Sequence, residues 1–398
     1  MATAADTTAE NAAPTHQLLF YTLVVVAFLA ASGVPTPLYP LYQASWHFST
    51  PMLTLAFAIY MFALLLALLM TGRLSEYLGR RPVILLGLAI EVVAMLGFLV
   101  AQDLGVLLLA RALQGLATGI ATSALGAALI DTDHRRGPIL ASVAPLVGMG
   151  LGALCSGFLV DLAPYPMRLG FLLMTGIFVW QLIGLRGTQE SVSPRPGALA
   201  SLKPTARIPV SVRPTFLRVI PACIASWSLG GFSLSLGPVL ARQVSGIDNA
   251  MIGGLLVCLL AVMGALGVWC LQRQNTRWIL MLSGILLPLG MAIVLWGVAR
   301  HDILILLAGI TVAGPGFGAG FMGAMRAIMS LAPQGERSSL MAVLYVASYL
   351  SASLPALMAG IAMQRFGLAS TVYGYGTYVI VLSLSALVGV LSQRQATK

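Results

Sequence analysis

The amino-acid sequence predicts an all-α polytopic membrane protein with twelve transmembrane helices in two six-helix pseudo-repeat halves. Of its 398 residues, 59% are hydrophobic and 9% are charged, whereas roughly 25% are charged in a soluble domain. The mean hydropathy is +0.94. The apolar residues form runs of roughly 20 to 25, which is the length that crosses a hydrocarbon layer about 30 Å thick. A polar stretch near the middle of the chain leaves six such runs on each side.

These runs are predicted to be helices and not barrel strands. In lipid every backbone N–H and C=O group must be bonded within the protein, and the runs lack the period-two alternation of barrel strands. In chain order the predicted spans are 17–41, 51–72, 82–101, 104–130, 138–160, 165–186, 216–241, 250–271, 278–299, 303–329, 339–362 and 370–392.

The basic residues predict how the chain is oriented in the membrane. With both termini in the cytoplasm, and residues near span ends counted with the adjacent side, 17 of the 22 Lys and Arg residues lie on the cytoplasmic side, four lie on the outer side and one lies well inside a span. This bias follows the positive-inside rule. The net charge of +10 is therefore explained by topology, and we expect no nucleic-acid partner. Abundant arginine and alanine are typical of bacteria with GC-rich genomes, so we expect a multi-pass protein of a bacterial inner (plasma) membrane.

The spans divide the chain into two bundles joined by a linker. We predict a cytoplasmic tail over 1–16, a six-helix bundle over 17–186, a proline-rich basic linker over 187–214, a second bundle over 215–392 and a tail over 393–398. The first tail contains no Lys or Arg, so we expect no cleaved leader.

An offset of 203 residues aligns parts of the two halves. It places Val143–Gly157 over Val346–Gly360, and Gly115 over Gly318. This internal similarity favours duplication. Two halves related by an axis along the membrane normal recur among transport proteins.

A short cytoplasmic turn after the second span carries a distinctive motif. It reads GRLSEYLGRRP, beginning at Gly72. This first glycine permits close helix approach, and Gly79 permits a tight turn. The guanidinium groups of Arg80 and Arg81 can pair with Glu76 or with helix C-termini. The alternative interpretation is a pair of positive-inside anchors beside a turn.

This turn resembles the loop motif G-x-L-x-D-x-x-G-R-R of the major facilitator superfamily. The resemblance implies a major facilitator fold, with the turn acting as a cytoplasmic gate that joins the halves while the outside is open. Its carboxylate, here a glutamate in place of aspartate, is then expected to face the start of the eleventh helix, near Ser338 and Ser339. The expected gate residues are Gly72, Leu74, Glu76, Gly79, Arg80 and Arg81.

The fourth span contains ARALQGLATG, beginning at Ala110, which is similar to the family motif R-x-x-Q-G at Arg111, Gln114 and Gly115. An arginine within a span costs at least ~2.5 kcal/mol unless it faces water or a partner, which indicates a functional role. The resemblance implies that Arg111 points towards the first span and the central cavity and contributes to substrate or proton coupling. The alternative is that its side chain extends to the nearby outer surface.

Glu91 is the other charged residue well inside a span, near the middle of the third. Its burial inside a span makes it a candidate proton carrier, and Arg111 lies on the next helix. The alternative is a structural hydrogen-bonding residue on a peripheral helix. The carboxylates of Asp131 and Asp161 lie at span ends, where solvated carboxylates are ordinary.

The fifth span retains part of an export pattern. Proton antiporters of the family usually show G-P-x-x-G-G, whereas this chain reads APLVGM from Ala144 and keeps only Pro145 and Gly148. On this partial pattern the resemblance favours export over uptake.

Segments rich in Gly and Pro predict broken helices that line a central cavity. They surround Pro35 and Pro37 and run over 228–238, 313–321 and 349–355. For any single aromatic residue in or near them, core packing or interfacial anchoring is the alternative. The candidate lining residues are Pro35, Pro37, Tyr39, Tyr60, Trp227, Phe232, Phe317, Tyr345 and Tyr349, and the expected helix bends are at Pro145, Gly148 and Pro355.

Together these features predict a secondary active transporter that works by alternating access, with proton movement driving export of a small lipophilic or amphipathic molecule. The alternatives are uptake of a metabolite or organic anion paired with Arg111 and, more remotely, a membrane enzyme or receptor. The spans lack clusters at metal-ligand or acid–base spacing, so we expect neither an enzyme nor a metal site. No nucleotide-binding loop or cofactor is expected. The resemblance implies a functional monomer in the lipid bilayer.

Overall fold

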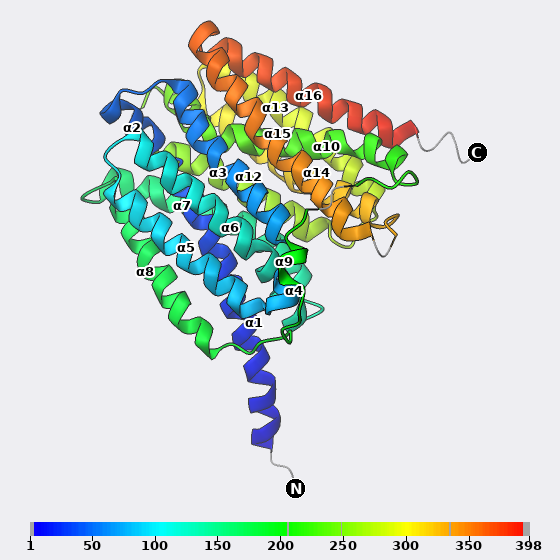
Figure 1. Cartoon of the computed structure of the whole chain (residues 1–398). Helices are drawn as coiled ribbons and strands as arrows, with labels where there is room; N and C mark the ends of the chain where they lie inside the picture. Colours follow the sequence, from blue (N-terminus) through cyan, green and yellow to red (C-terminus); the bar gives the residue numbers. More distant parts are fainter. Residues whose placement is uncertain (1–3, 205–206, 248, 334–335, 393–398) are drawn as a thin grey trace.

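The computed structural model describes residues 4–204, 207–247, 249–333 and 336–392, with side chains from Thr15 onwards. In this part of the chain the protein is all-helical (Figure 1). Twelve of these helices are long and apolar enough to cross a membrane, so the predicted fold class is confirmed. The predicted tail over 393–398 lies outside the described residues, and the other domain boundaries stay predictions.

The spanning helices alternate in direction through the bundle. They are α1 (Ala4–Gly33), α3 (Thr50–Thr71), α5 (Arg80–Val100), α6 (Leu104–Thr132), α7 (Gly137–Leu162), α8 (Leu169–Gly184), α10 (Arg213–Ser235), α12 (Ala250–Leu271), α13 (Thr276–Arg300), α14 (Ile303–Met329), α15 (Arg337–Phe366) and α16 (Leu368–Leu391). The shorter elements are α2 (Tyr39–Trp46), α4 (Ser75–Leu78), η1 (Leu185–Gly187), α9 (Ala198–Ser201) and α11 (Gly237–Ser245).

We call the end of the bundle with α4, η1 and α9 the linker end, and the opposite end with α2 and α11 the distal end. Equivalent helices pack in the same way in both halves: α1 on α7 and α10 on α15, α3 on α6 and α12 on α14, α5 on α8 and α13 on α16. Between the halves, α3 packs on α15 and α7 packs on α12. In Figure 1 the halves are inclined to each other.

Two of the four predicted helix breaks occur. The chain leaves the helix after Gly33 and resumes at Tyr39, and α10 ends at Ser235 just before α11. The predictions over 313–321 and 349–355 were wrong, because α14 and α15 are continuous there. The glycines of α14 instead allow close packing: a β-carbon on Gly318 would lie 2.2 Å from the carbonyl oxygen of Gly264 on α12. Small residues at such crossings are typical of membrane helices.

The same crossing exists in the first half. A β-carbon on Gly115 would lie 2.3 Å from the carbonyl oxygen of Tyr60 on α3. Since Gly115 and Gly318 are the pair aligned by the offset of 203 residues, the sequence similarity corresponds to equivalent helix contacts in the two halves.

Candidate functional site

Arg111 lies on α6 near the distal end and is buried, with only 1% of its surface exposed. Its Nε donates to the Tyr39 hydroxyl at 2.9 Å, and its Nη2 donates to the same oxygen. Its Nη1 donates to Gln114 Oε1 at 2.7 Å and to the carbonyl oxygen of Ser32 at 3.3 Å. The side chain therefore points towards α1 and α2, and the alternative that it extends to the surface is wrong.

Two aromatic rings also contact this guanidinium group. The Arg111 Cζ atom lies 5.4 Å from the ring centre of Tyr39 and 5.3 Å from that of Tyr60. Cation–π contacts of this kind are strongest where water is excluded. Arginine suits the position because its planar group stacks on rings while its N–H groups bind acceptors at its edge.

Glu91 on α5 joins the same group of residues. It is fully buried, and its Oε1 accepts a hydrogen bond from Gln114 Nε2 at 3.3 Å. Its Oε2 has no hydrogen-bond partner among the described residues. The Gln114 amide therefore connects the two ionisable groups, with its oxygen towards Arg111 and its nitrogen towards Glu91. We call these three residues the Arg111–Gln114–Glu91 network.

The predicted gate turn is bound mainly to its own half. Gly79 adopts a positive φ of +97°, a conformation that favours glycine. The Arg80 Nε lies 3.0 Å from Asp131 Oδ2 on α6, and Arg81 Nη2 donates to the carbonyl oxygen of Arg186 at 3.3 Å. Pairing of these arginines with Glu76 is not found among the described contacts, whereas the bond from Arg81 to Arg186, in the turn that ends α8, matches the alternative expectation of a helix C-terminus.

Glu190 of the linker caps the N-terminus of α5. Its two carboxylate oxygens accept from the backbone N–H groups of Arg80 and Arg81 at 2.7 and 2.9 Å. A carboxylate at this place satisfies free N–H groups and complements the helix dipole. The linker is therefore fixed on the gate turn.

Among the described residues, Glu76 has no partner at the start of α15, where it was expected to lie. Its Oε2 lies 3.5 Å from Nη2 of the linker residue Arg195 and 4.0 Å from Arg73 Nε. Near the start of α15, Ser339 Oγ instead accepts from the backbone N–H of Arg207 at 2.7 Å. The linker thus binds both Glu76 and Ser339, the two groups that the resemblance expects to lie against each other.

Gly72 also differs from its expected role. The nearest atom to a β-carbon there is the carbonyl oxygen of Leu68, one turn earlier in the same chain, at 2.7 Å. A second helix therefore does not approach at Gly72. Leu74, in the same turn, is buried in the first half.

Four of the aromatic candidates lie in two places, around Arg111 and on α10 and α15. Tyr39 and Tyr60 belong to the surroundings of Arg111. Pro35 and Pro37, which lie between Ser32 and Tyr39 in the chain, are buried. Trp227 on α10 belongs to the second half: its ring centre lies 4.8 Å from that of Tyr349.

We call four rings at this place the aromatic cluster. Trp227 lies 5.6 Å from Phe321 of α14, and Tyr345 lies 6.3 Å from Tyr349 on α15, both between ring centres. Sequence reasoning missed Phe321, although it lies one helical turn after Phe317 in the same glycine-rich segment. Phe317 itself packs against Gly230 and Gly264.

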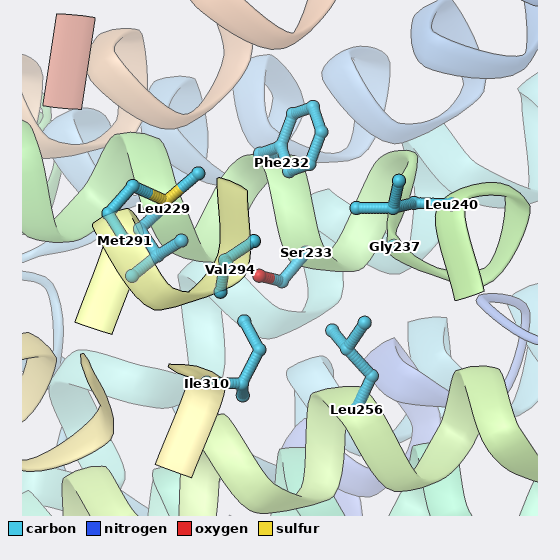
Figure 2. A pocket seen from close by; sticks show the side chains of 9 residues that line it. All are labelled: Leu229, Phe232, Ser233, Gly237, Leu240, Leu256, Met291, Val294 and Ile310. Atoms are coloured by element: carbon cyan, nitrogen blue, oxygen red, sulfur yellow. The ribbon is translucent and has the colours of Figure 1, made fainter. Parts of the chain in front are cut away.

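Phe232 lies apart from this cluster. Its ring centre is 4.6 Å from that of Tyr375 on α16, within the second half. Figure 2 shows it beside a cavity of about 10 Å³, lined almost entirely by apolar side chains, with the hydroxyl of Ser233 as the polar exception. We therefore do not place Phe232 at the path between the halves.

The expected bend positions lie within continuous helices. Pro145 and Gly148 are inside α7, and Pro355 is inside α15. Gly148 has a packing reason, because a β-carbon there would lie 2.4 Å from the carbonyl oxygen of Val26 on α1.

A bundle of twelve spanning helices in two similar halves, with an arginine and a glutamate buried in one half, defines a membrane transport protein. The model of the Major Facilitator Superfamily matches residues 21–356, and the chain belongs to this superfamily.

The chain is similar in sequence to several curated transporters. The chain is 31% identical over 114 residues to the transporter paaT of Penicillium rubens, covering 28% of this chain and 21% of that protein. It is 30% identical over 159 residues to the multidrug resistance protein MdtL of Klebsiella pneumoniae, covering 37% and 39%. It is 26% identical over 301 residues to MdtL of Salmonella typhi, covering 72% and 73%. The first two matches thus span about a fifth and two fifths of those relatives.

Solved structures share the fold. The nucleoside transporter NupG aligns with a TM-score of 0.70 at 10% identity, covering 94% of this chain and 99% of that one. The peptide transporter POT aligns with a TM-score of 0.71 at 16% identity, covering 93% of each chain.

Proposed function

We propose that this transporter works by alternating access and couples proton movement to export of small lipophilic or amphipathic organic molecules. The observation that carries the proposal is the Arg111–Gln114–Glu91 network. It contains a fully buried carboxylate joined through one amide to a buried guanidinium. Ionisable groups kept inside a membrane span are costly, and they commonly belong to ion or proton pathways.

The network offers a mechanism for coupling. The Arg111 side chain stays charged, whereas Glu91 can gain or lose a proton. A proton on Glu91 makes the net charge of the network more positive. When the proton leaves, the negative charge of Glu91 balances the positive charge of Arg111 on the other side of the Gln114 amide. Because Arg111 also binds Ser32 of α1 and Tyr39 of α2, the protonation state of Glu91 acts on helices at the distal end.

The aromatic cluster is the proposed contact surface for the substrate. Its rings come from α10, α14 and α15, all in the second half. Trp227, Phe321 and Tyr345 are only partly buried, and such rings offer apolar area with a few polar atoms. The names of the MdtL relatives support drug-like molecules as substrates.

The remaining features of the proposal concern the membrane. We propose that both termini lie in the cytoplasm of a bacterial inner membrane and that one chain is the working unit. The excess of Lys and Arg on one side supports the orientation.

One observation favours a second candidate, the uptake of an organic anion. Among the described residues, the hydrogen-bond acceptors of Arg111 are a phenol, an amide and a backbone carbonyl, and all three are neutral. A guanidinium bound only by neutral oxygens could exchange one of them for the carboxylate of a substrate.

Transport in proteoliposomes after a pH jump tests the proposal. The probes are a lipophilic cation, a neutral aromatic compound and a small organic anion, and the variant is Glu91→Gln. We expect gradient-driven movement of a lipophilic probe by the parent protein. In the variant this movement should be lost, while counterflow without a gradient should persist.

A matched control is Asp302→Asn, which alters a carboxylate that caps α14 at the distal end. It should keep both activities. Gradient-driven transport by Glu91→Gln at the parent's rate would refute the coupling role of Glu91. If only the anionic probe moves, the result favours uptake of an organic anion and contradicts export of lipophilic molecules.

A further inference from the structure

Asp161 stands at the end of α7 and contacts the other half of the protein. Its Oδ1 accepts a hydrogen bond from the backbone N–H of Ala250 at 3.0 Å, and its Oδ2 accepts from that of Met251 at 2.8 Å. Ala250 and Met251 are the first two residues of α12. A carboxylate of the first half therefore binds a helix N-terminus of the second half.

The first turn of α12 is capped jointly from both halves. Its own N-cap residue, Asn249, accepts from the N–H of Ile252 at 3.3 Å. The N–H groups of the two preceding residues are those bound by Asp161. The first N–H groups of a helix have no partner inside the helix, and negative charge is favourable beside them. Separation of α7 from α12 at this end leaves two of these groups without their carboxylate.

The surrounding contacts show that the halves meet closely at the distal end. A β-carbon on Gly157, one turn before Asp161, would lie 2.9 Å from both the carbonyl oxygen of Ala250 and the Cα of Met251. In the α3–α15 contact, a β-carbon on Gly360 would lie 2.2 Å from Thr54 Oγ1. The backbones therefore approach each other at two places on this end.

The linker end is arranged differently. There Glu76 is bound by Arg195 and Ser339 is bound by the backbone of Arg207. Both partners belong to the linker, so the linker separates the groups through which the gate turn is expected to reach α15. The gate turn thus reaches α15 through the linker, whereas Asp161 of the first half contacts α12 directly at the distal end.

We propose that Asp161 is a latch that holds the distal end closed, and that its two hydrogen bonds to α12 must break each time this end opens. Asp161 is a positioning residue in this proposal: it touches neither the Arg111–Gln114–Glu91 network nor the aromatic cluster. The inference depends on alternating access and is independent of substrate, direction and coupling ion.

The expected effect on the conformational equilibrium is moderate. Asp161 is exposed at the surface, so solvent weakens its attraction to the helix dipole. We expect Asp161→Asn to raise the population with an open distal end by about three- to tenfold. Asparagine keeps the size of the side chain and one acceptor oxygen but loses the charge and the second acceptor.

The test measures access to the distal end by thiol labelling. Thr54 is fully buried beneath the contact with Gly360, so Thr54→Cys reports opening of this end. We would use the full chain in nanodiscs with its four native cysteines replaced, and a membrane-impermeant maleimide. Nanodiscs expose both faces, so the orientation of the protein does not affect the result.

Two control variants separate a latch from a simple helix cap. Asn249→Ala removes the cap that α12 provides for itself, and Asp103→Asn weakens a cap confined to α6. The labelling rate of Thr54→Cys should rise about three- to tenfold with Asp161→Asn and stay within about twofold with either control.

The outcomes are distinct. An unchanged rate in Asp161→Asn would overturn the latch, as would an equal rise in Asn249→Ala, which would indicate fraying of α12. Size-exclusion profiles and melting temperatures of the variants must match those of the parent. If Asp161→Asn proves unstable, Asp161→Glu is compared with the parent instead; because it keeps the charge, its labelling should be slow. Failure of pH-driven transport would leave these labelling results unaffected, so the latch and the proposed function can fail separately.

Discussion

Replacement of Arg111 by lysine should weaken the first half even though the positive charge is kept. The guanidinium binds three acceptors on two sides: Tyr39 on one, and Ser32 and Gln114 on the other. A lysine ammonium is a compact point charge and reaches only one of these sides.

The structure gives the size of the effect. One or two of the three buried acceptors lose their donor in Arg111→Lys. A hydrogen bond between membrane helices contributes about 0.6 kcal/mol on average and up to about 1.7 kcal/mol. We therefore expect a loss of about 1–3 kcal/mol in the free energy of unfolding. If the same contacts are needed during transport, the rate should fall about five- to hundredfold, since 1.4 kcal/mol corresponds to a factor of ten.

Two assays measure this. Unfolding of purified protein by a denaturing detergent gives the stability change, and counterflow in proteoliposomes gives the transport rate. Arg168→Lys is the control, because Arg168 is an exposed residue outside the spans and its replacement should change stability by no more than about 0.5 kcal/mol. If Arg111→Lys equals the parent protein in both assays, the planar geometry of the guanidinium is not needed and the reasoning fails.

Two further predictions concern packing and pH. Gly318→Ala should destabilise the protein by about 1–3 kcal/mol through overpacking against α12, whereas Gly126→Ala, where no atom lies within 4 Å of an added β-carbon, should stabilise it by up to about 1 kcal/mol; denaturant midpoints of both variants check this, and equal shifts would contradict it. The backbone N–H groups of Arg136 and Arg135 hold the pKa of Asp133 below its usual value, so the turn is stabilised above the ordinary aspartate pKa and loses this stabilisation as the pH falls through the lowered value. Hydrogen-exchange protection of these two amides should fall with acid in the parent protein and be low at every pH in Asp133→Ala.

The helices themselves were predictable from the sequence because their cause is local. Runs of about 20 apolar residues have few alternatives in lipid, and the twelve spans are found with ends that differ by at most eight residues, the largest difference being at the end of the first span. Helix breaks were less predictable. The proline-rich segment around Pro35 and Pro37 does interrupt a helix, whereas the glycine-rich segment around Pro315 does not. In the second case the neighbouring helix α12 packs against the glycines, and a single sequence does not reveal which neighbour a segment will have.

The site was predictable where a charge stands inside a span. Arg111 and Glu91 were found for that reason, since burial of an ionisable group is unusual. Asp161, Glu190 and Arg195 were not found. Each lies in a polar segment or at a span end, where charged residues are common, and each acts through a partner more than 80 residues away in the chain.

The contact between α7 and α12 is made largely by residues that have no side chain to interlock. Gly157 and Gly254 bring the two backbones together, since each would collide with the opposite helix if it carried a β-carbon, and Gly150 would be in tight contact with Ala261. Few single substitutions in this contact leave the backbones in place, whereas the aromatic cluster, which we propose as the substrate surface, lies on α10, α14 and α15 outside it. Mutational drift in a lineage of such proteins should therefore alter what is carried much faster than how the two halves move.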